Sequence, residues 1–129
     1  MILDTHCHFD MMPNPEKYIK DAENRGDIVV GMTNLPSHFR MGINHVKCYN
    51  NIRLGLGFHP QLISEHMTEL AIFESSVNQT SYIGEIGLDF SRDYIASKDI
   101  QLECLKRILS SICEKKKIVS VHSRKAEKE

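Results

Sequence analysis

The chain has 129 residues, of which 41% are hydrophobic and 26% are charged, and its formal net charge is −1. This composition is ordinary for a globular domain, and the near-neutral charge predicts neither a nucleic-acid binder nor a membrane-surface protein that works by bulk electrostatics. The length predicts one domain, residues 1–129, that can bury a real core.

The sequence shows no pattern typical of a signal peptide, a membrane-spanning segment or a disulfide framework. The start, Met-Ile-Leu-Asp, has no basic segment followed by a long apolar run, so we expect no signal peptide. No run approaches ~18 apolar residues, so we expect no membrane span. The four cysteines contain no CxxC pair, which favours reduced thiols in a cytoplasmic protein over a disulfide framework.

Short apolar runs alternate with helical patterns along the chain. A strand is expected at Met1–Asp4, followed by a helix that is capped by Asn14, begins at Pro15 and stops at Gly26. The remaining predicted elements, in chain order, are a strand at Ile28–Met32, a helix at Ser37–Val46, a strand at Ile52–Leu56, a helix at about Thr68–Val77, a strand at Tyr82–Ile86, a helix at Asp99–Lys116 and a strand at Ile118–His122. The last helix has the clearest apolar stripe, made of Leu102, Leu105, Ile108, Leu109 and Ile112.

The order of these elements predicts an α/β fold with a parallel sheet. Five strands with four intervening helices are typical of either a doubly wound sheet or a barrel. The strands are short and continuously apolar, as expected for strands that are buried on both faces. A complete eight-stranded barrel needs roughly 200–250 residues, so a barrel would be interrupted here after its fifth strand.

Polar side chains gather where the predicted strands end. The βα loops of parallel folds converge at the carboxyl ends of the strands, which is where such folds place their sites. The residues at these ends are His6 and His8, Thr33 and Asn34, His59, Glu85 and Asp89, and His122.

The pair His6-x-His8 is a candidate metal-binding motif. Residues two apart on a strand share a face, with Cα atoms roughly 6.5–7 Å apart, so both imidazoles can reach one cation. Nitrogen ligands suit Zn²⁺, Mn²⁺, Ni²⁺ or Fe²⁺ better than Ca²⁺. The alternative is a coincidental HxH, against which Asp4 and Asp10 on either side argue. Cys7 is expected to point away into the core.

The other candidates have a functional and a structural interpretation. Glu85 lies between two glycines and could bridge two metal ions, or it could be an exposed turn residue. His122 could be a ligand or an interior histidine, and His59 could donate to a substrate or pack in its loop. Arg124 could fork onto a phosphate or be an ordinary surface arginine.

Four segments together carry a family resemblance. They are Asp4-Thr5-His6-Cys7-His8-Phe9-Asp10, Gly55-Leu56-Gly57-Phe58-His59-Pro60, Gly84-Glu85-Ile86-Gly87-Leu88-Asp89-Phe90, and His122-Ser123-Arg124 followed by Ala126. In this order and spacing the chain resembles the TatD family of amidohydrolase-type (β/α)₈ barrels, which are Mg²⁺-, Mn²⁺- or Zn²⁺-dependent DNases with 3′-5′ exonuclease activity. Thr33-Asn34-Leu35-Pro36 is most similar to the TatD-related proteins of Qat-type anti-phage systems.

The resemblance implies a site with two divalent metal ions. His6 and His8 would hold the first ion, His122 the second, and Glu85 would bridge both. His59 and Arg124 match family positions near the substrate phosphate, and with Glu85 they would form the catalytic set.

The resemblance also implies an incomplete TIM (β/α)₈ barrel, because family members supply a further histidine from the sixth strand and an aspartate from the eighth. Losing such groups should weaken metal binding by about an order of magnitude or more per group. We therefore expect the isolated chain to be inactive or impaired.

Three functions remain open at this point. The chain could belong to a DNase that acts on a DNA substrate and whose barrel is completed by a partner chain. It could be a non-catalytic, truncated binding subunit or remnant. It could also be a metal-dependent amidohydrolase acting on a small molecule.

Overall fold

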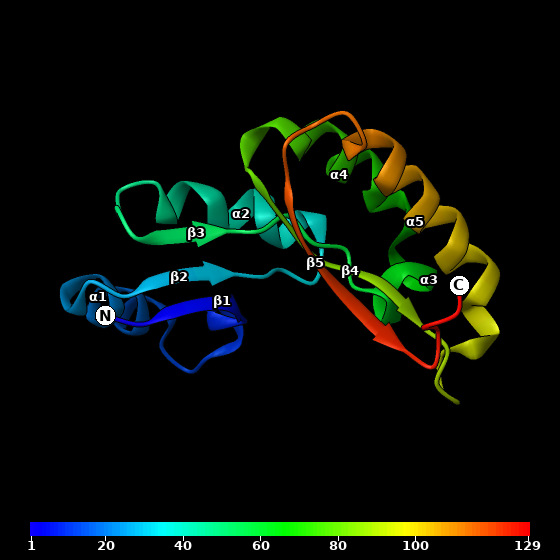
Figure 1. Cartoon of the computed structure of the whole chain (residues 1–129), viewed down its shortest axis with the longest axis horizontal. Coiled ribbons are helices and arrows are strands. Elements are labelled where there is room, and N and C mark those ends of the chain that lie inside the picture. Colours follow the sequence, from blue (N-terminus) through cyan, green and yellow to red (C-terminus); the bar gives the residue numbers. More distant parts are fainter.

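The computed structural model describes residues 1–129 as a curved sheet of five parallel strands (Figure 1). The strands are β1 (Leu3–Cys7), β2 (Ile28–Gly31), β3 (Ile52–Leu54), β4 (Tyr82–Asp89) and β5 (Ile118–Arg124). Strands β1, β2 and β3 are hydrogen-bonded in that order, and β4 pairs with β5. A parallel bridge between Leu56 and Ile83 joins the two groups. The spatial order therefore follows the chain order, as in a barrel, and the doubly wound alternative is wrong.

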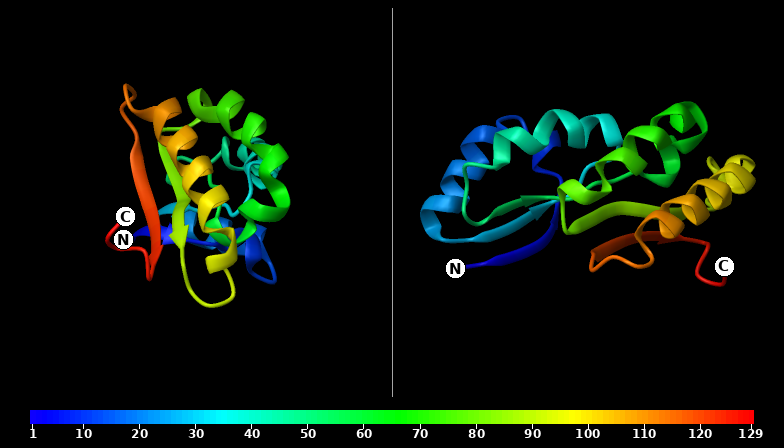
Figure 2. Two further views of the ribbon diagram at one scale, coloured as in Figure 1. Left: turned by 90° about the vertical axis from the view of Figure 1, so that its right-hand side faces the viewer. Right: turned by 90° about the horizontal axis from the view of Figure 1, so that it is seen from above.

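All the helices lie on one face of this sheet (Figure 2). They are α1 (Pro15–Arg25), α2 (Pro36–Val46), α3 (Ile63–His66), α4 (Leu70–Ser76) and α5 (Lys98–Ile112). All four predicted helices are present, but the one predicted at about Thr68–Val77 is the shorter α4, and the unpredicted α3 precedes it, separated by a 3-10 turn, Met67–Glu69. This turn places Glu69 where its carboxylate accepts the backbone N–H of Ser37 at 3.0 Å, at the start of α2.

Each of the five strands differs from its predicted range at one end or both, and the differences in β1 and β4 concern the site. Pairing of β1 with β2 begins at Leu3 and continues to Cys7, so His6 lies inside the strand and His8 just after it. Pairing of β4 with β5 continues to Asp89 and Arg124, three residues beyond the predicted end of β4. The hydrogen-bonding partner on the neighbouring strand, which a local pattern does not show, fixes both ends.

The core lies between the helices and the outer face of the sheet. Its largest side chains are completely buried, among them Phe39, Phe58 and Phe73. Cys7 belongs to this core, as predicted. The apolar stripe of α5 is rotated from the prediction, because the helix packs against β4, α3 and α4 through Cys104, Ile108 and Ile112. Leu109 points away from that face and is 46% exposed, so its assignment to the core was wrong.

The other face of the sheet is open and apolar. A cavity of about 350 Å³ lies on this face. Side chains of β1, β2, β4 and β5 line it, including Leu3, Ile28, Val30, Tyr82 and Ile118. Leu3 and Ile118 are each 65% exposed there. The outer edges of β1 and β5 have no neighbouring strand.

None of the helices has the length and apolar character needed to cross a membrane.

Candidate metal centre

Glu85 is the centre of a cluster of four imidazoles at the carboxyl ends of the strands. Its Oε2 atom lies 3.0 Å from Nε2 of His8 and 3.4 Å from Nε2 of His6. Its Oε1 atom lies 2.9 Å from Nδ1 of His122 and 3.7 Å from Nε2 of His59. The Glu85 side chain is only 12% exposed, so the alternative of an exposed turn residue is wrong. Each carboxylate oxygen thus faces its own pair of imidazoles.

The backbone of Glu85 is fixed by the ends of β2 and β3. Its N–H donates to the carbonyl of Thr33 at 3.2 Å, and its carbonyl accepts from the N–H of Phe58 at 3.0 Å. Thr33 also donates through its hydroxyl to the carbonyl of Gly55 at 2.8 Å. A Cβ atom at Gly57 would lie 1.7 Å from the Thr33 carbonyl oxygen, so only glycine permits this close approach. The segments that follow β2 and β3 therefore position the carboxylate of Glu85 on β4.

The first group of candidate ligands consists of His6, His8 and Glu85, whose nitrogen and oxygen atoms lie within 4.8 Å of one another. The ring of His6 is oriented by a contact of 2.7 Å between its Nδ1 atom and Oγ of Ser120 on β5. That contact leaves Nε2 of His6 directed at Glu85. Sequence reasoning missed Ser120, because no local pattern relates it to β1.

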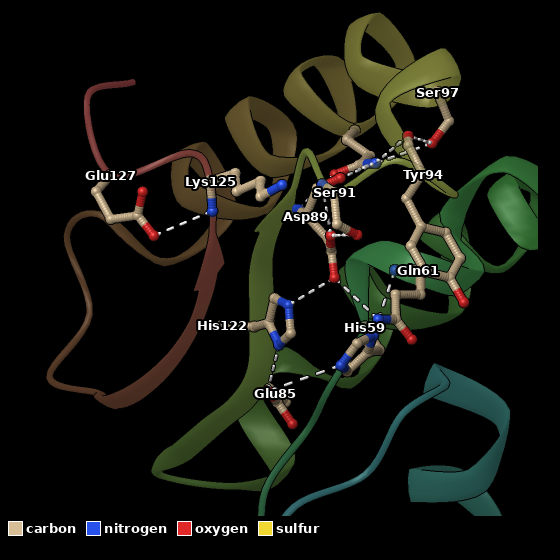
Figure 3. Close-up of polar contacts among 11 residues, drawn as sticks. His59, Gln61, Glu85, Asp89, Ser91, Tyr94, Ser97, His122, Lys125 and Glu127 are labelled. Atoms are coloured by element: carbon tan, nitrogen blue, oxygen red, sulfur yellow. Dashed lines mark hydrogen bonds and ion pairs between the residues drawn. The ribbon is translucent and has the colours of Figure 1, made fainter.

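The second group consists of His59, Glu85 and His122, and its hydrogen bonds separate the roles of the two histidines (Figure 3). Nδ1 of His59 accepts the backbone N–H of Gln61 at 3.2 Å. A neutral His59 therefore carries its proton on Nε2, which faces Oε1 of Glu85 at 3.7 Å, and in this tautomer it has no nitrogen lone pair free for a metal ion. The role of His59 beside the substrate stays a prediction.

His122 lies between two carboxylates (Figure 3). Its Nε2 atom is 3.0 Å from Oδ2 of Asp89, and its Nδ1 atom is 2.9 Å from Oε1 of Glu85. If the ring is neutral and donates to Asp89, the lone pair of Nδ1 faces a carboxylate oxygen. Two acceptors at this distance repel each other unless a proton or a metal cation lies between them.

The electrostatics of the cluster favour an ionised carboxylate. The hydrogen bond from His8 lowers the pKa of Glu85 to about 2 against the opposing effect of burial, and His59 and His122 contribute to the lowering. The hydrogen bond to Glu85 raises the pKa of His8, while burial lowers the pKa of His59. Burial alone would raise the pKa of Asp89, but the hydrogen bonds that it accepts hold it below its ordinary value.

The residues present fit divalent metal ions. Imidazole nitrogens with one carboxylate are the donor set of Zn²⁺ and Mn²⁺ sites and are unsuited to Ca²⁺. A cation between Nδ1 of a neutral His122 and Oε1 of Glu85 would remove their repulsion, and the two oxygens of Glu85 face separate groups of nitrogens. His6, His8 and Glu85 would hold one ion, and Glu85 with His122 a second.

Arg124 and the remaining histidines lie outside the cluster. The Arg124 guanidinium is exposed and makes no hydrogen bond or ion pair. It lies two residues beyond His122 on β5, and alternation along the strand places both on the same face. His38 and His45 are exposed, and half-buried His66 is 3.5 Å from Glu69, so none of these three belongs to the site.

The fold and the cluster together define the class of protein. Parallel strands joined by outer helices, with a carboxylate and imidazoles at the carboxyl ends of the strands, form part of a metal-centred α/β barrel. The family model described as TatD related DNase matches residues 3–129. The chain belongs to this family.

Two similar proteins extend this comparison. The chain is 26% identical, over 132 residues, to an uncharacterized metal-dependent hydrolase of Buchnera aphidicola subsp. Baizongia pistaciae; the match covers 95% of this chain and 49% of that protein. It superimposes with a TM-score of 0.79 on the crystal structure of YJJV, a TatD homologue from Escherichia coli K12, at 24% identity, and covers 96% of this chain and 51% of that one. The likeness confirms the predicted incomplete TIM (β/α)₈ barrel. The chain spans about half the length of the relatives it matches.

Proposed function

We propose that this chain forms the metal-binding half of a phosphodiesterase that hydrolyses DNA from its 3′ end. The observation that carries the proposal is the position of Glu85, whose two oxygens each face a separate pair of imidazoles. Such a carboxylate can bridge two divalent ions. The family to which the chain belongs supports DNA as the substrate.

Each side chain of the cluster has a distinct part in this proposal. Two divalent ions, when bound, supply positive charge to a phosphate oxygen and lower the pKa of a water molecule. The Nε2–H group of His59 points into the site and is available to an anionic oxygen of the substrate. Arg124 has an unoccupied guanidinium on the same face as His122 and can form two parallel hydrogen bonds to a phosphate.

We further propose that activity requires a polypeptide that closes the barrel. The open edges of β1 and β5 and the apolar cavity between them have the form of a surface that further parallel strands would cover. The partner would be a β/α segment equivalent to the half of the relatives that this chain leaves unmatched. It would bury Leu3 and Ile118 and could supply further ligands.

The test is digestion of 3′-labelled single-stranded DNA with Mn²⁺ or Mg²⁺. The chain is assayed alone and after co-expression with the unmatched half of the Buchnera relative or the polypeptide encoded directly after codon 129. We expect cleavage in the closed form that Glu85→Ala abolishes and that Glu65→Ala, an exposed glutamate of α3, leaves unchanged. Cleavage that survives Glu85→Ala would refute the proposed site.

The same assay separates the alternatives. A closed, metal-bound protein that leaves DNA intact but hydrolyses a lactone or an amide would show a small-molecule amidohydrolase. A closed protein that cleaves nothing would show a non-catalytic binding subunit. Membership of a Qat-type anti-phage system stays a prediction, which survival of phage infection in cells with and without Glu85→Ala would test.

A further inference from the structure

We propose that Asp89 is a positioning residue that selects Nδ1 of His122 as the nitrogen available to a metal ion. This inference rests on the proposed metal centre but concerns a residue outside the ligand set. Asp89 would act by fixing both the rotation of the His122 ring and the nitrogen that carries its proton.

Asp89 is completely buried, and donors occupy both of its carboxylate oxygens. Oδ1 accepts the backbone N–H of Ser91 at 2.9 Å and the Ser91 hydroxyl. Oδ2 accepts from Nε2 of Gln61 at 2.8 Å and lies 3.0 Å from Nε2 of His122. Three donors already point at the carboxylate, which favours its ionised form, and the remaining lone pair of Oδ2 faces Nε2 of His122, so that Asp89 accepts from His122.

The proton on Nε2 determines what the other nitrogen can do. A neutral imidazole has one donor and one acceptor nitrogen, so a ring that donates from Nε2 keeps the Nδ1 lone pair free. Nδ1 is the atom that lies 2.9 Å from Glu85. A histidine that binds a metal through one nitrogen commonly donates its other N–H to a carboxylate, which is the arrangement here.

The position of Asp89 is itself fixed by α5. The side chain of Gln101, which is completely buried, accepts the backbone N–H of Asp89 at 2.8 Å and donates to its carbonyl at 2.9 Å. The same amide nitrogen of Gln101 also lies within donor distance of Oγ of Ser97, at 2.8 Å, and of the carbonyl of Tyr94, at 3.1 Å. The helix, the end of β4 and the loop between them thus form one rigid support.

The network is costly for a role in stability alone. A buried carboxylate loses its hydration, and hydrogen bonds recover that loss only when every acceptor is satisfied. Here residues from three segments are used to satisfy it: Gln61 after β3, Ser91 after β4 and His122 on β5. The ring of His122 cannot flip without losing its bond to Asp89 and moving Nδ1 away from Glu85.

The first test needs no substitution. Long-range ¹H–¹⁵N NMR of the metal-free chain, well above the ordinary histidine pKa, reports which nitrogen of His122 is protonated. We expect the proton on Nε2. A proton on Nδ1 in the wild-type chain would overturn the proposal whatever the variants do.

The second test is Asp89→Asn. This substitution keeps the shape of the side chain but replaces one carboxylate oxygen, an acceptor, with an NH₂ group, a donor. We expect the proton of His122 to move toward Nδ1 and the affinity for Mn²⁺ or Zn²⁺, measured by calorimetry, to fall by roughly 10- to 100-fold. Asp93→Asn, the same change at an exposed aspartate of the following loop, should alter neither. An unchanged His122 spectrum and affinity in a folded Asp89→Asn variant would contradict the proposal.

These readouts also distinguish this inference from the proposed function. If the metal-bound, closed protein fails to cleave DNA while Asp89→Asn still moves the His122 proton and weakens metal binding, the substrate is wrong and the role of Asp89 stands. If DNA is cleaved normally by Asp89→Asn with unchanged metal affinity, the role of Asp89 is refuted and the metal centre stands.

Discussion

His6 on β1 and Ser120 on β5 are in contact across the inside of the sheet, with Nδ1 of His6 2.7 Å from Oγ of Ser120. The two residues are 114 positions apart and lie on the two edge strands. Only the curvature of the sheet brings the first strand and the last together. The contact therefore links one candidate metal ligand to the strand at the opposite edge of the sheet.

We expect Ser120→Ala to weaken metal binding without unfolding the chain. The His6 ring would lose the partner that directs its Nε2 atom at Glu85, and the affinity for Mn²⁺ should fall by about 10-fold. Calorimetric titration measures the affinity, and circular dichroism checks the fold. Ser123→Ala, at an exposed serine of the same strand that makes no side-chain hydrogen bond, is the matched control and should bind normally.

The two histidines that face Oε1 of Glu85 should differ in their effect on metal binding. His122 offers the Nδ1 lone pair, whereas Nδ1 of His59 is occupied by the Gln61 N–H and its Nε2 carries a proton. His122→Gln should lower metal affinity by an order of magnitude or more, and His59→Gln should leave it unchanged. In the closed barrel His59→Gln should instead reduce the rate of DNA cleavage. Equal losses of affinity in the two variants would show that both histidines are ligands.

The stability of the metal-free chain should depend on Glu85 at acid pH. The contacts with imidazoles lower the pKa of Glu85 from an ordinary value of 4.5 to about 2. A lowered carboxyl pKa stabilises the folded state above the ordinary value, and this stabilisation is lost as the pH falls through the folded value. Between pH 4.5 and 2 the wild-type free energy of unfolding should therefore fall by up to about 3 kcal/mol more than that of Glu85→Gln.

His8, which contacts Glu85, should make the stability of the folded chain depend on pH in the opposite sense, at a higher pH. The pKa of His8 is raised from 6.5, so its contribution to stability is present below that value and is lost as the pH rises through the raised pKa. Urea unfolding between acid and mildly alkaline pH measures the contributions of Glu85 and His8 to stability. If the free energy of unfolding of Glu85→Gln varied with pH in parallel with that of the wild type, the ion pair between His8 and Glu85 would be contradicted.

Two neighbouring residues of α5 should have very different effects on stability. Ile108 is 1% exposed and packs in the main core, whereas Leu109 is 46% exposed. Ile108→Ala should cost about 2–5 kcal/mol of unfolding free energy, because it leaves a cavity. Leu109→Ala should cost about 0.5 kcal/mol or less. Chemical denaturation measures both, and a large loss at Leu109 would mean that the helix is rotated as the sequence pattern predicts.

The sequence by itself determined the order of strands and helices, the place of the candidate site and the identity of its central residues. Apolar periodicity reports burial directly, and polar residues at the strand ends stand out against it, so His6, His8, Glu85 and His122 could be found locally as candidates, while the resemblance to the TatD family implied their roles as ligands. The same reasoning misplaced Leu109, because a stripe of apolar residues does not show which part of it faces the core.

Only the tertiary structure decided how these residues act. Which nitrogen of His59 or His122 carries a proton depends on partners that lie far away in the chain, and so does the support of Asp89 by Gln101. Gln101 is a polar residue among the buried residues of α5. The sequence shows this exception to the apolar pattern, but it does not show which groups Gln101 contacts. Hydrogen bonds between distant segments depend on the distances and angles that folding sets, and a sequence pattern carries no such geometry.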